Sequence, residues 1–331
     1  MFALPELDEL YVVSDIHMGG APGFQILREG PRLGKLITKL ASTRPGERVG
    51  LVLNGDVIDS LAEDIEGYIA IDDADRMMAR LYADPTFAPV WDGLAAFVQQ
   101  PGRRLVLVLG NHDIEMALPL IEASIRARLT GGDETASGRI TFATHGAGFG
   151  CLVGRARVFC THGNEVDAWN LIDHDALRSL AMSQTAGTSF DRASWEPNAG
   201  TQLVKEVMNG IKQKYAWIDL LKPETEAALG VLLVLDPGQA LKVQRIRGAL
   251  SAYVNKMKGG LKMSGWLSAD QLAAAPVTSP QAVPVEQLLG PNLLSALRGG
   301  GSVSSDADAM SAVARVGSLP TSTIFRTWSG R

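Results

Sequence analysis

The first half of the chain alternates short apolar runs with longer segments in which apolar residues recur every three or four positions. The short runs predict buried strands, and the longer segments predict amphipathic helices. Strands are expected at 10–13, 49–53 and 105–109, and helices at 32–42, 74–82, 89–99 and 115–129, the last interrupted by Pro119. This alternation predicts an α/β fold.

The pattern changes in the second half of the chain. Three further strands, at 140–143, 150–153 and 157–161, follow one another closely with glycine-rich connections. Such spacing predicts an antiparallel extension. From about residue 199 a helical apolar stripe begins, and beyond residue 265 Pro, Gly and Ser dominate, as is typical of linkers. We therefore predict a core over 1–198, a helical insertion or cap over 199–265 and a linker-like, disordered segment over 266–331.

Composition narrows the class of partner. The chain has 331 residues, of which 46% are hydrophobic, and this supports a substantial core. A net charge of −5 argues against nucleic acid as the main partner, because phosphate backbones require basic surfaces. With no signal peptide and no apolar run long enough to cross a membrane, we predict a cytoplasmic protein in which Cys151 and Cys160 stay reduced. The sequence does not decide whether the protein contacts a membrane surface peripherally.

Polar motifs with the side chains of metal ligands lie directly after predicted strands. They are Asp15-Ile16-His17, Gly55-Asp56-Val57-Ile58-Asp59, Gly110-Asn111-His112-Asp113 and His162-Gly163. Ligands of open α/β sheets collect outside the carboxyl ends of the strands, so segments far apart in sequence can build one site. The motifs therefore predict a shared pocket that holds divalent metal ions.

The residue types indicate what that pocket would do. Asp15 and His17 can share one cation, Asp56 can bridge two, and Asn111 and His162 offer further donors. This mixed set suits Mn²⁺ best, with Fe or Zn²⁺ as alternatives. Two cations about 3.5–4 Å apart can activate a bridging water for in-line displacement at phosphorus.

Two further roles follow from the positions of the remaining motif residues. His112, next to Asn111 and followed by Asp113, is the candidate acid that protonates the leaving oxygen, and a nearby carboxylate would fix its tautomer. We therefore take His112 and Asp113 as the catalytic pair. Asp59 is predicted to orient its neighbours from outside the ligand set.

These motifs resemble those of the calcineurin-like metallophosphoesterase superfamily, whose pattern is DxH, GDxxD, GNH(D/E), a lone His and then GHxH. The resemblance covers roughly residues 8–170. It implies a two-sheet sandwich flanked by helices and a dinuclear metal centre. By that resemblance Asp15 and His17 hold the first metal, Asp56 bridges both, Asn111 and His162 hold the second, and His112 is the acid.

The run from His162 to Asp167 also looks like the HGxxxD motif of the branch that includes UDP-2,3-diacylglucosamine hydrolases. That branch typically carries Arg at the position of His112, so the substrate stays open. No Gly-His-x-His follows His162, and the only later histidine is His174, which we expect to be solvated. His145 is expected to be a loop residue. Either the chain is a truncated product or the site is incomplete, and we favour truncation.

Three hypotheses therefore stand. The leading one is a metal-dependent phosphoesterase that hydrolyses a phosphomonoester, phosphodiester or pyrophosphate of a small phosphorylated substrate. The second is a nuclease of the same superfamily, which the acidic balance disfavours. The third is a catalytically impaired scaffold with the phosphoesterase fold, which the missing GHxH motif favours and His112 disfavours. An apolar cap would suit an amphiphilic substrate.

Overall fold

The structure is a computed structural model that describes residues 4–167, 170–191 and 195–212. The chain divides into two compact units, and every described residue lies in the first, which comprises Met1–Ala216 and Lys242–Leu250. Most of the predicted insertion over 199–265 and the whole predicted linker over 266–331 therefore lie outside the described residues. The three-part division of the chain stays a prediction.

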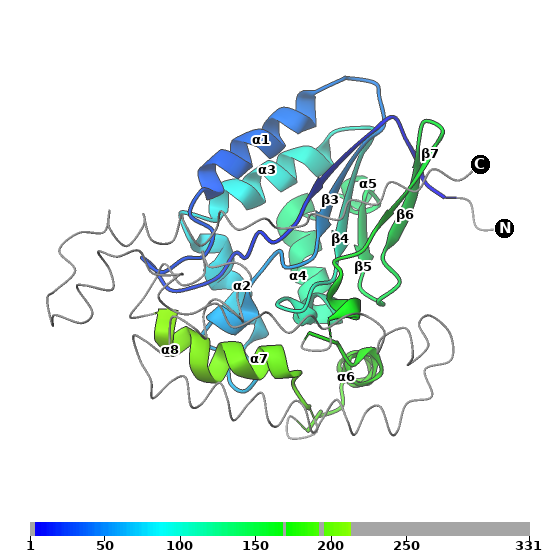
Figure 1. Cartoon of the computed structure of the whole chain (residues 1–331). Coiled ribbons are helices and arrows are strands. Elements are labelled where there is room, and N and C mark those ends of the chain that lie inside the picture. The colour runs from blue at the N-terminus through cyan, green and yellow to red at the C-terminus, as the bar shows by residue number, and fades with distance from the viewer. Residues whose placement is uncertain (1–3, 168–169, 192–194, 213–331) are drawn as a thin grey trace, which may run out of the picture. The chain divides into compact units, whose positions relative to one another are not determined.

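A parallel four-stranded sheet forms the centre of this unit (Figure 1). Its strands, in spatial order, are β2 (Glu9–Val13), β3 (Val49–Asn54), β4 (Arg103–Val108) and β5 (Ile140–Ala143). The helices between them are α1 (Gly30–Ser42), α2 (Ala74–Ala83), α3 (Ala88–Gln99), α4 (Pro119–Thr130) and α5 (Glu134–Ser137). The predicted strands and helices of this half are confirmed to within a few residues.

The second sheet corrects one prediction. It contains β1 (Glu6–Leu7), β6 (Phe149–Val153) and β7 (Ala156–Cys160), in the order β1-β6-β7. Only β6 and β7 pair antiparallel, whereas β5 pairs parallel with β4. The prediction of three antiparallel strands was wrong for β5, because α4 and α5 separate it from β4 and a crossover of that length returns the chain in the same direction. The fold is thus the predicted two-sheet α/β architecture flanked by helices.

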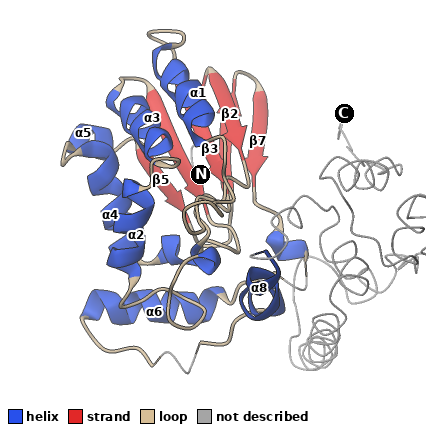
Figure 2. Ribbon diagram, turned by 90° about the vertical axis from the view of Figure 1, so that its left-hand side faces the viewer, coloured by secondary structure: helices blue, strands red, loops and turns tan. Residues whose placement is uncertain are grey.

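The two faces of the parallel sheet are buried against different partners. On β3, Leu51 and Leu53 belong to the core shared with the helices, while Val52 belongs to the cluster shared with the second sheet. On β4, Leu107 and Val106 divide in the same way. Burial on both faces explains why these strands read as continuous apolar runs. Figure 2 shows α1 and α3 side by side over the helical face of the sheet.

Short elements complete the described unit. They are the 3-10 turns at Ser60–Ala62, Ile114–Ala117 and Asn164–Val166, the helices α6 (His174–Ala186), α7 (Ala199–Leu203) and α8 (Asn209–Lys212), and a π-helical turn at Val204–Met208. The helix predicted over 115–129 begins only at Pro119, because proline is favoured in the first turn of a helix, where its missing N–H costs nothing. No described helix combines the length and the apolar character that crossing a bilayer requires.

One buried carboxyl group gives a prediction on stability. Glu115 has no exposed surface, and burial raises its pKa to about 7, although the amide of Ala70 donates to its Oε1 at 2.8 Å. Relative to its ordinary pKa of 4.5, this shift stabilises the protonated fold at low pH, and the stabilisation is lost as the pH rises through the folded pKa.

We therefore compare the free energy of unfolding of Glu115→Gln with that of the wild type. The difference, variant minus wild type, should be about 2 to 3 kcal/mol larger at pH 8 than at pH 5. Urea unfolding of chelator-treated protein at the two pH values measures the difference. Glu134→Gln, at an exposed position, is the matched control and should show no such change. A difference between wild type and Glu115→Gln that does not change with pH contradicts the prediction.

Candidate metal centre

The predicted ligands come from loops at one end of the sandwich. Asp15 and His17 follow β2, Asp56 follows β3, Asn111 follows β4 and His162 follows β7. The backbone of the first two loops continues the pairing of β2 with β3 past the strand ends. The amide of His17 donates to the carbonyl of Asp56 at 2.8 Å, and Met18 bridges to Ile58. The order of the motifs along the sequence therefore becomes proximity in space.

Asp56 is the centre of the cluster. Its Oδ2 lies 3.6 Å from Nε2 of His17 and 3.3 Å from Nε2 of His162. Its Oδ1 accepts the backbone N–H of His112 at 2.9 Å, which fixes the orientation of the carboxylate. Asp15 approaches from the solvent side, with its Oδ1 4.0 Å from Nε2 of His17. Four predicted ligands thus point their donor atoms at one another.

The backbone conformation at these positions is unusual. Only four described residues other than glycine have a positive φ, and three of them are Asp15 (56°), His17 (50°) and Asp56 (54°). The left-handed region is unfavourable for residues with a Cβ and persists only where the surroundings impose it. Such outliers concentrate at functional sites, so their coincidence with the predicted ligands supports a functional role for this end of the sandwich.

The motif glycines make room for these ligands. A Cβ on Gly110 would lie 2.1 Å from Oδ1 of Asp56, and a Cβ on Gly55 would lie 2.3 Å from the ring of His162. Any side chain at either position would displace a ligand. Gly55 also has a φ of +83°, which residues with a side chain rarely adopt. The close approach of neighbouring loops therefore explains why glycine precedes both Asp56 and Asn111.

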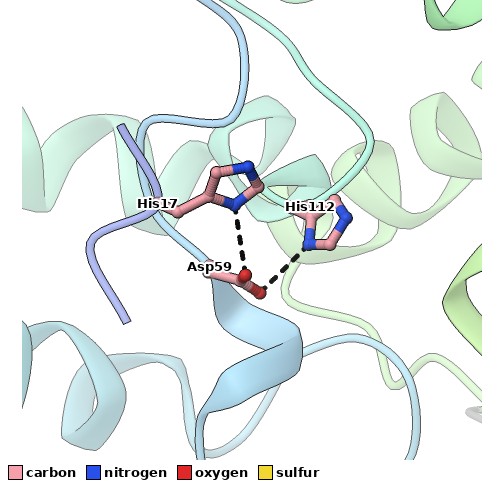
Figure 3. A group of neighbouring side chains, drawn as sticks. All are labelled: His17, Asp59 and His112. Atoms are coloured by element: carbon pink, nitrogen blue, oxygen red, sulfur yellow. Dashed lines mark hydrogen bonds and ion pairs between the residues drawn. The ribbon is translucent and has the colours of Figure 1, made fainter. Parts of the chain in front are cut away.

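Asp59 lies behind the ligands and contacts two imidazoles (Figure 3). Its Oδ2 is 3.1 Å from Nδ1 of His17, and its Oδ1 is 3.2 Å from Nδ1 of His112. Burial alone would raise the pKa of Asp59, but the two histidines hold it well below its ordinary value. An ionised Asp59 therefore fixes both rings with Nδ1 toward itself and leaves the opposite edge of each ring for other partners.

The other imidazole of the cluster is fixed by a backbone carbonyl. Nδ1 of His162 is 2.9 Å from the carbonyl oxygen of Asn54, so Nε2 is the nitrogen that faces Asp56. Burial lowers the pKa of His162, yet the hydrogen bond and charge of Asp56 raise it to about 9. The pKa of His17 is also raised, because Asp59 and Asp56 outweigh its burial. Protons and cations would therefore compete for these nitrogens.

Asp113 differs from its predicted role as catalytic partner of His112. Its Oδ1 accepts the N–H of Gly110 at 2.7 Å and its Oδ2 accepts the N–H of Val57 at 2.6 Å. Burial, and then the charge of Asp56, raise its pKa to about 7. The carboxylate that contacts the ring of His112 is instead that of Asp59. Asp113 joins the loops after β3 and β4, which places it beneath the site.

Three other residues considered as metal ligands, Asn111, His145 and His174, do not share in the contacts around Asp56. Asn111 is buried beside His112, and its amide forms no hydrogen bond with another described residue. His145 is an exposed loop residue after β5, as expected. His174 begins α6 and is half-buried, not solvated as predicted, and this burial lowers the pKa of its imidazole. Neither of these two histidines belongs to a potential metal-binding group of the described residues.

Within the described part of the chain, two groups of side chains have donor atoms close enough to hold one ion. The first is Asp15, His17 and Asp56, and the second is His17, Asp59 and His112. In the second group both nitrogens already face Asp59, so its atoms are satisfied by one another. The first group turns Nε2 of His17 toward two carboxylates, and His162 adds a further nitrogen. This set of oxygen and imidazole donors fits a borderline divalent cation.

Sequence reasoning did not identify the part of Asn54. The carbonyl oxygen of Asn54 holds the ring of His162, and its side-chain amide donates to the carbonyl of Thr161 at 2.9 Å. A backbone carbonyl has no signature in the sequence. The only available signal was the position of Asn54, between a buried strand and Gly55.

Comparison with known protein families identifies the family of the chain. The family model for calcineurin-like phosphoesterases matches residues 9–215, which is more than half of the chain. The chain belongs to the calcineurin-like phosphoesterases. The resemblance that the motifs indicated is therefore confirmed for the superfamily, whereas the branch that includes UDP-2,3-diacylglucosamine hydrolases stays a prediction. Searches of curated proteins and of solved structures gave no match.

For a calcineurin-like phosphoesterase, this chain draws its candidate ligands from the first four motifs. All of them lie within residues 9–215, and the sequence contains no histidine after His174. The residues that converge supply two carboxylates and two imidazoles, with Asn111 alongside.

Proposed function

We propose that this calcineurin-like phosphoesterase hydrolyses a phosphomonoester, phosphodiester or pyrophosphate with a dinuclear metal centre. The observation that carries the proposal is the position of Asp56, whose Oδ2 lies between the Nε2 atoms of His17 and His162. From this position the carboxylate of Asp56 would reach a cation held by either imidazole. When bound, divalent cations would supply Lewis acidity for the phosphoryl group and an activated water.

The residues of the chain would bind the cations and donate the proton to the leaving group. Asp15 and His17 would hold one cation, Asn111 and His162 the other, and Asp56 both. His112 would donate a proton to the leaving oxygen, because its ring lies on the loop next to Asn111 and has its Nδ1 against Asp59. Asp59 holds the Nδ1 edge of that ring, so the opposite edge would be the one that faces the leaving oxygen.

The metal and the substrate follow from the donors and the charge. We favour Mn²⁺, with Fe or Zn²⁺ as alternatives, because mixed carboxylate and imidazole donors suit these ions. The proposed substrate is a small phosphorylated molecule and not a nucleic acid, given the net charge of −5. We also propose a cytoplasmic location. Cys151 and Cys160 are free, buried thiols, which is compatible with a reducing compartment.

Removal of metal tests this function. We expect chelator-treated protein to lose hydrolysis of p-nitrophenyl phosphate or its bis-ester, and added Mn²⁺ to restore it, because the bound ions supply both charge stabilisation and the nucleophile. Zn²⁺ and Mg²⁺ provide the comparison, and Mg²⁺ should restore least because it accepts imidazole ligands poorly. Hydrolysis that is unaffected by chelation, or that no metal restores with either ester, contradicts the proposal.

A further inference from the structure

A helical segment far along the chain contacts the loop that follows Asp59. This segment comprises α7, the π-helical turn and α8, over residues 199–212, and the loop runs from 61 to 70. Nζ of Lys205 donates to the carbonyl of Ile65 at 2.9 Å and also to the carbonyl of Gly67. The contacts join residues about 140 positions apart in sequence. We refer to residues 61–70 as the Asp59 loop.

Two neighbours of Lys205 support the same contact. Nδ2 of Asn209 donates to the carbonyl of Leu61 at 2.8 Å, and the hydroxyl of Tyr68 donates to Oε1 of Glu206 at 2.5 Å. Lys205 and Glu206 both belong to the π-helical turn, and Asn209 directly follows it. π-Helical turns are rare and occur frequently at functional sites, because their extra residue changes which side chains share a face. Here the turn presents consecutive polar side chains to one loop.

The Asp59 loop depends on such contacts because it has little regular structure of its own. It begins in the 3-10 turn Ser60–Ala62, and its carbonyls at 65 and 67 are bound by Lys205. At its far end, Glu115 accepts the N–H of Ala70 at 2.8 Å. Hydrogen bonds from Lys205 and to Glu115 therefore satisfy backbone groups that a helix or strand would pair with one another.

The residues immediately before the Asp59 loop belong to the proposed catalytic centre and are bonded to its start. Oδ1 of Asp59 accepts the N–H of Ala62 at 3.2 Å while it contacts Nδ1 of His112. The hydroxyl of Ser60 donates to the carbonyl of His112 at 3.0 Å. A displacement of the Asp59 loop would therefore reach Asp59, and through it the rings of His17 and His112.

We propose that Lys205 is a positioning residue for the phosphoesterase centre. By holding the carbonyls of Ile65 and Gly67, it fixes the Asp59 loop so that Asp59 keeps both imidazoles in their working orientation. Lys205 suits this role because an ammonium group offers three donors on a long stem, and no neutral residue of similar length does. The inference rests on the proposed function for its kinetic consequence, but its structural consequence can be measured separately.

The kinetic test compares Lys205→Met, which keeps the length of the side chain, with Lys205→Arg, which keeps the charge. In the full chain with Mn²⁺ and p-nitrophenyl phosphate, we expect Lys205→Met to lower kcat about tenfold while KM changes less than about twofold. Lys205→Arg should recover a large part of kcat. Asn209→Ala should also lower kcat. Lys39→Met, on the exposed face of α1, is the control and should leave kcat unchanged.

The structural test uses imidazole signals in the NMR spectrum, which need no activity. The ring protons on Nδ1 of His17 and His112 should be protected from exchange in the wild type and in Lys205→Arg, and should exchange faster in Lys205→Met. If the wild type is inactive but these signals behave as expected, the proposed function fails and the positioning role stands. The proposal is overturned if Lys205→Met leaves kcat and the signals unchanged, or if its loss of kcat only matches its unfolded fraction by circular dichroism.

Discussion

Asp56→Asn is expected to lower kcat/KM of the Mn²⁺-dependent reaction by at least about a thousandfold, equivalent to about 4 kcal/mol of transition-state stabilisation. The substitution is nearly isosteric, so the fold and the Gly110 contact should survive. It removes the negative charge from the one side chain that faces His17 and His162 together. An amide oxygen is neutral where a carboxylate oxygen is charged, so the metal content should fall with activity.

The control for this variant is Asp75→Asn. Asp75 is exposed in the first turn of α2 and belongs to none of the ligand motifs. Its kcat/KM and metal content should equal those of the wild type. Steady-state kinetics and elemental analysis of the same preparations give both quantities. If Asp56→Asn kept wild-type activity and metal content, the bridging role of Asp56 would be wrong.

His112→Gln is expected to separate chemistry from metal binding. We predict that kcat for an alkyl phosphate, such as glycerol phosphate, falls about 10²- to 10⁴-fold, because the leaving alkoxide needs a proton. For p-nitrophenyl phosphate the loss should be much smaller, because p-nitrophenolate leaves without one. Metal content should stay that of the wild type, since the described contacts of the His112 ring are to Asp59 and to the ring of His17.

His145→Gln provides the matched comparison for His112, because His145 follows the neighbouring strand β5 and is exposed. Neither substrate should distinguish this variant from the wild type. Equal losses of kcat for both leaving groups in His112→Gln would contradict its role as the acid. A parallel loss of metal would show that His112 contributes to binding the ions.

The sequence predicted the parallel half of the fold well because burial on both faces gives strands a strong signal. The runs at 49–53 and 105–109 became β3 and β4, and the amphipathic segments between them became helices at nearly the predicted positions. The partner of β5 was not predictable from its own four residues. Its direction is set by the helices before it, and the close spacing of the later strands suggested a hairpin that only β6 and β7 form.

The sequence indicated which residues lie together at the site, but not which side chains contact one another. Asp15, His17, Asp56 and His162 converge as their positions after strands indicated. Which carboxylate contacts the ring of His112 could not be read from spacing, and it is that of Asp59. Asp113 is the neighbour of His112 in sequence, yet its oxygens are taken by two backbone amides of the loops it joins.

Left-handed backbone at three of these positions was equally invisible in the sequence. Asp and His adopt a positive φ more often than most residues with a side chain, but nothing in the sequence shows that Asp15, His17 and Asp56 all do so. The packing of the loops against one another imposes that conformation. The motif glycines, which permit the close approach of the loops, are the sequence feature related to it. Gly110 illustrates this, because its role is explained by the carboxylate that occupies the place of its missing side chain.

The most direct measurement is anomalous diffraction from a crystal of the full chain soaked in Mn²⁺. We predict at least one anomalous peak within coordination distance, about 2.0–2.3 Å, of Asp56 and of the imidazole Nε2 of His17 or His162. A crystal of Asp56→Asn treated in the same way should show that peak weakened or lost. A wild-type crystal with no peak at Asp56, or with manganese only elsewhere on the surface, would contradict the metal centre on which the proposed hydrolysis depends.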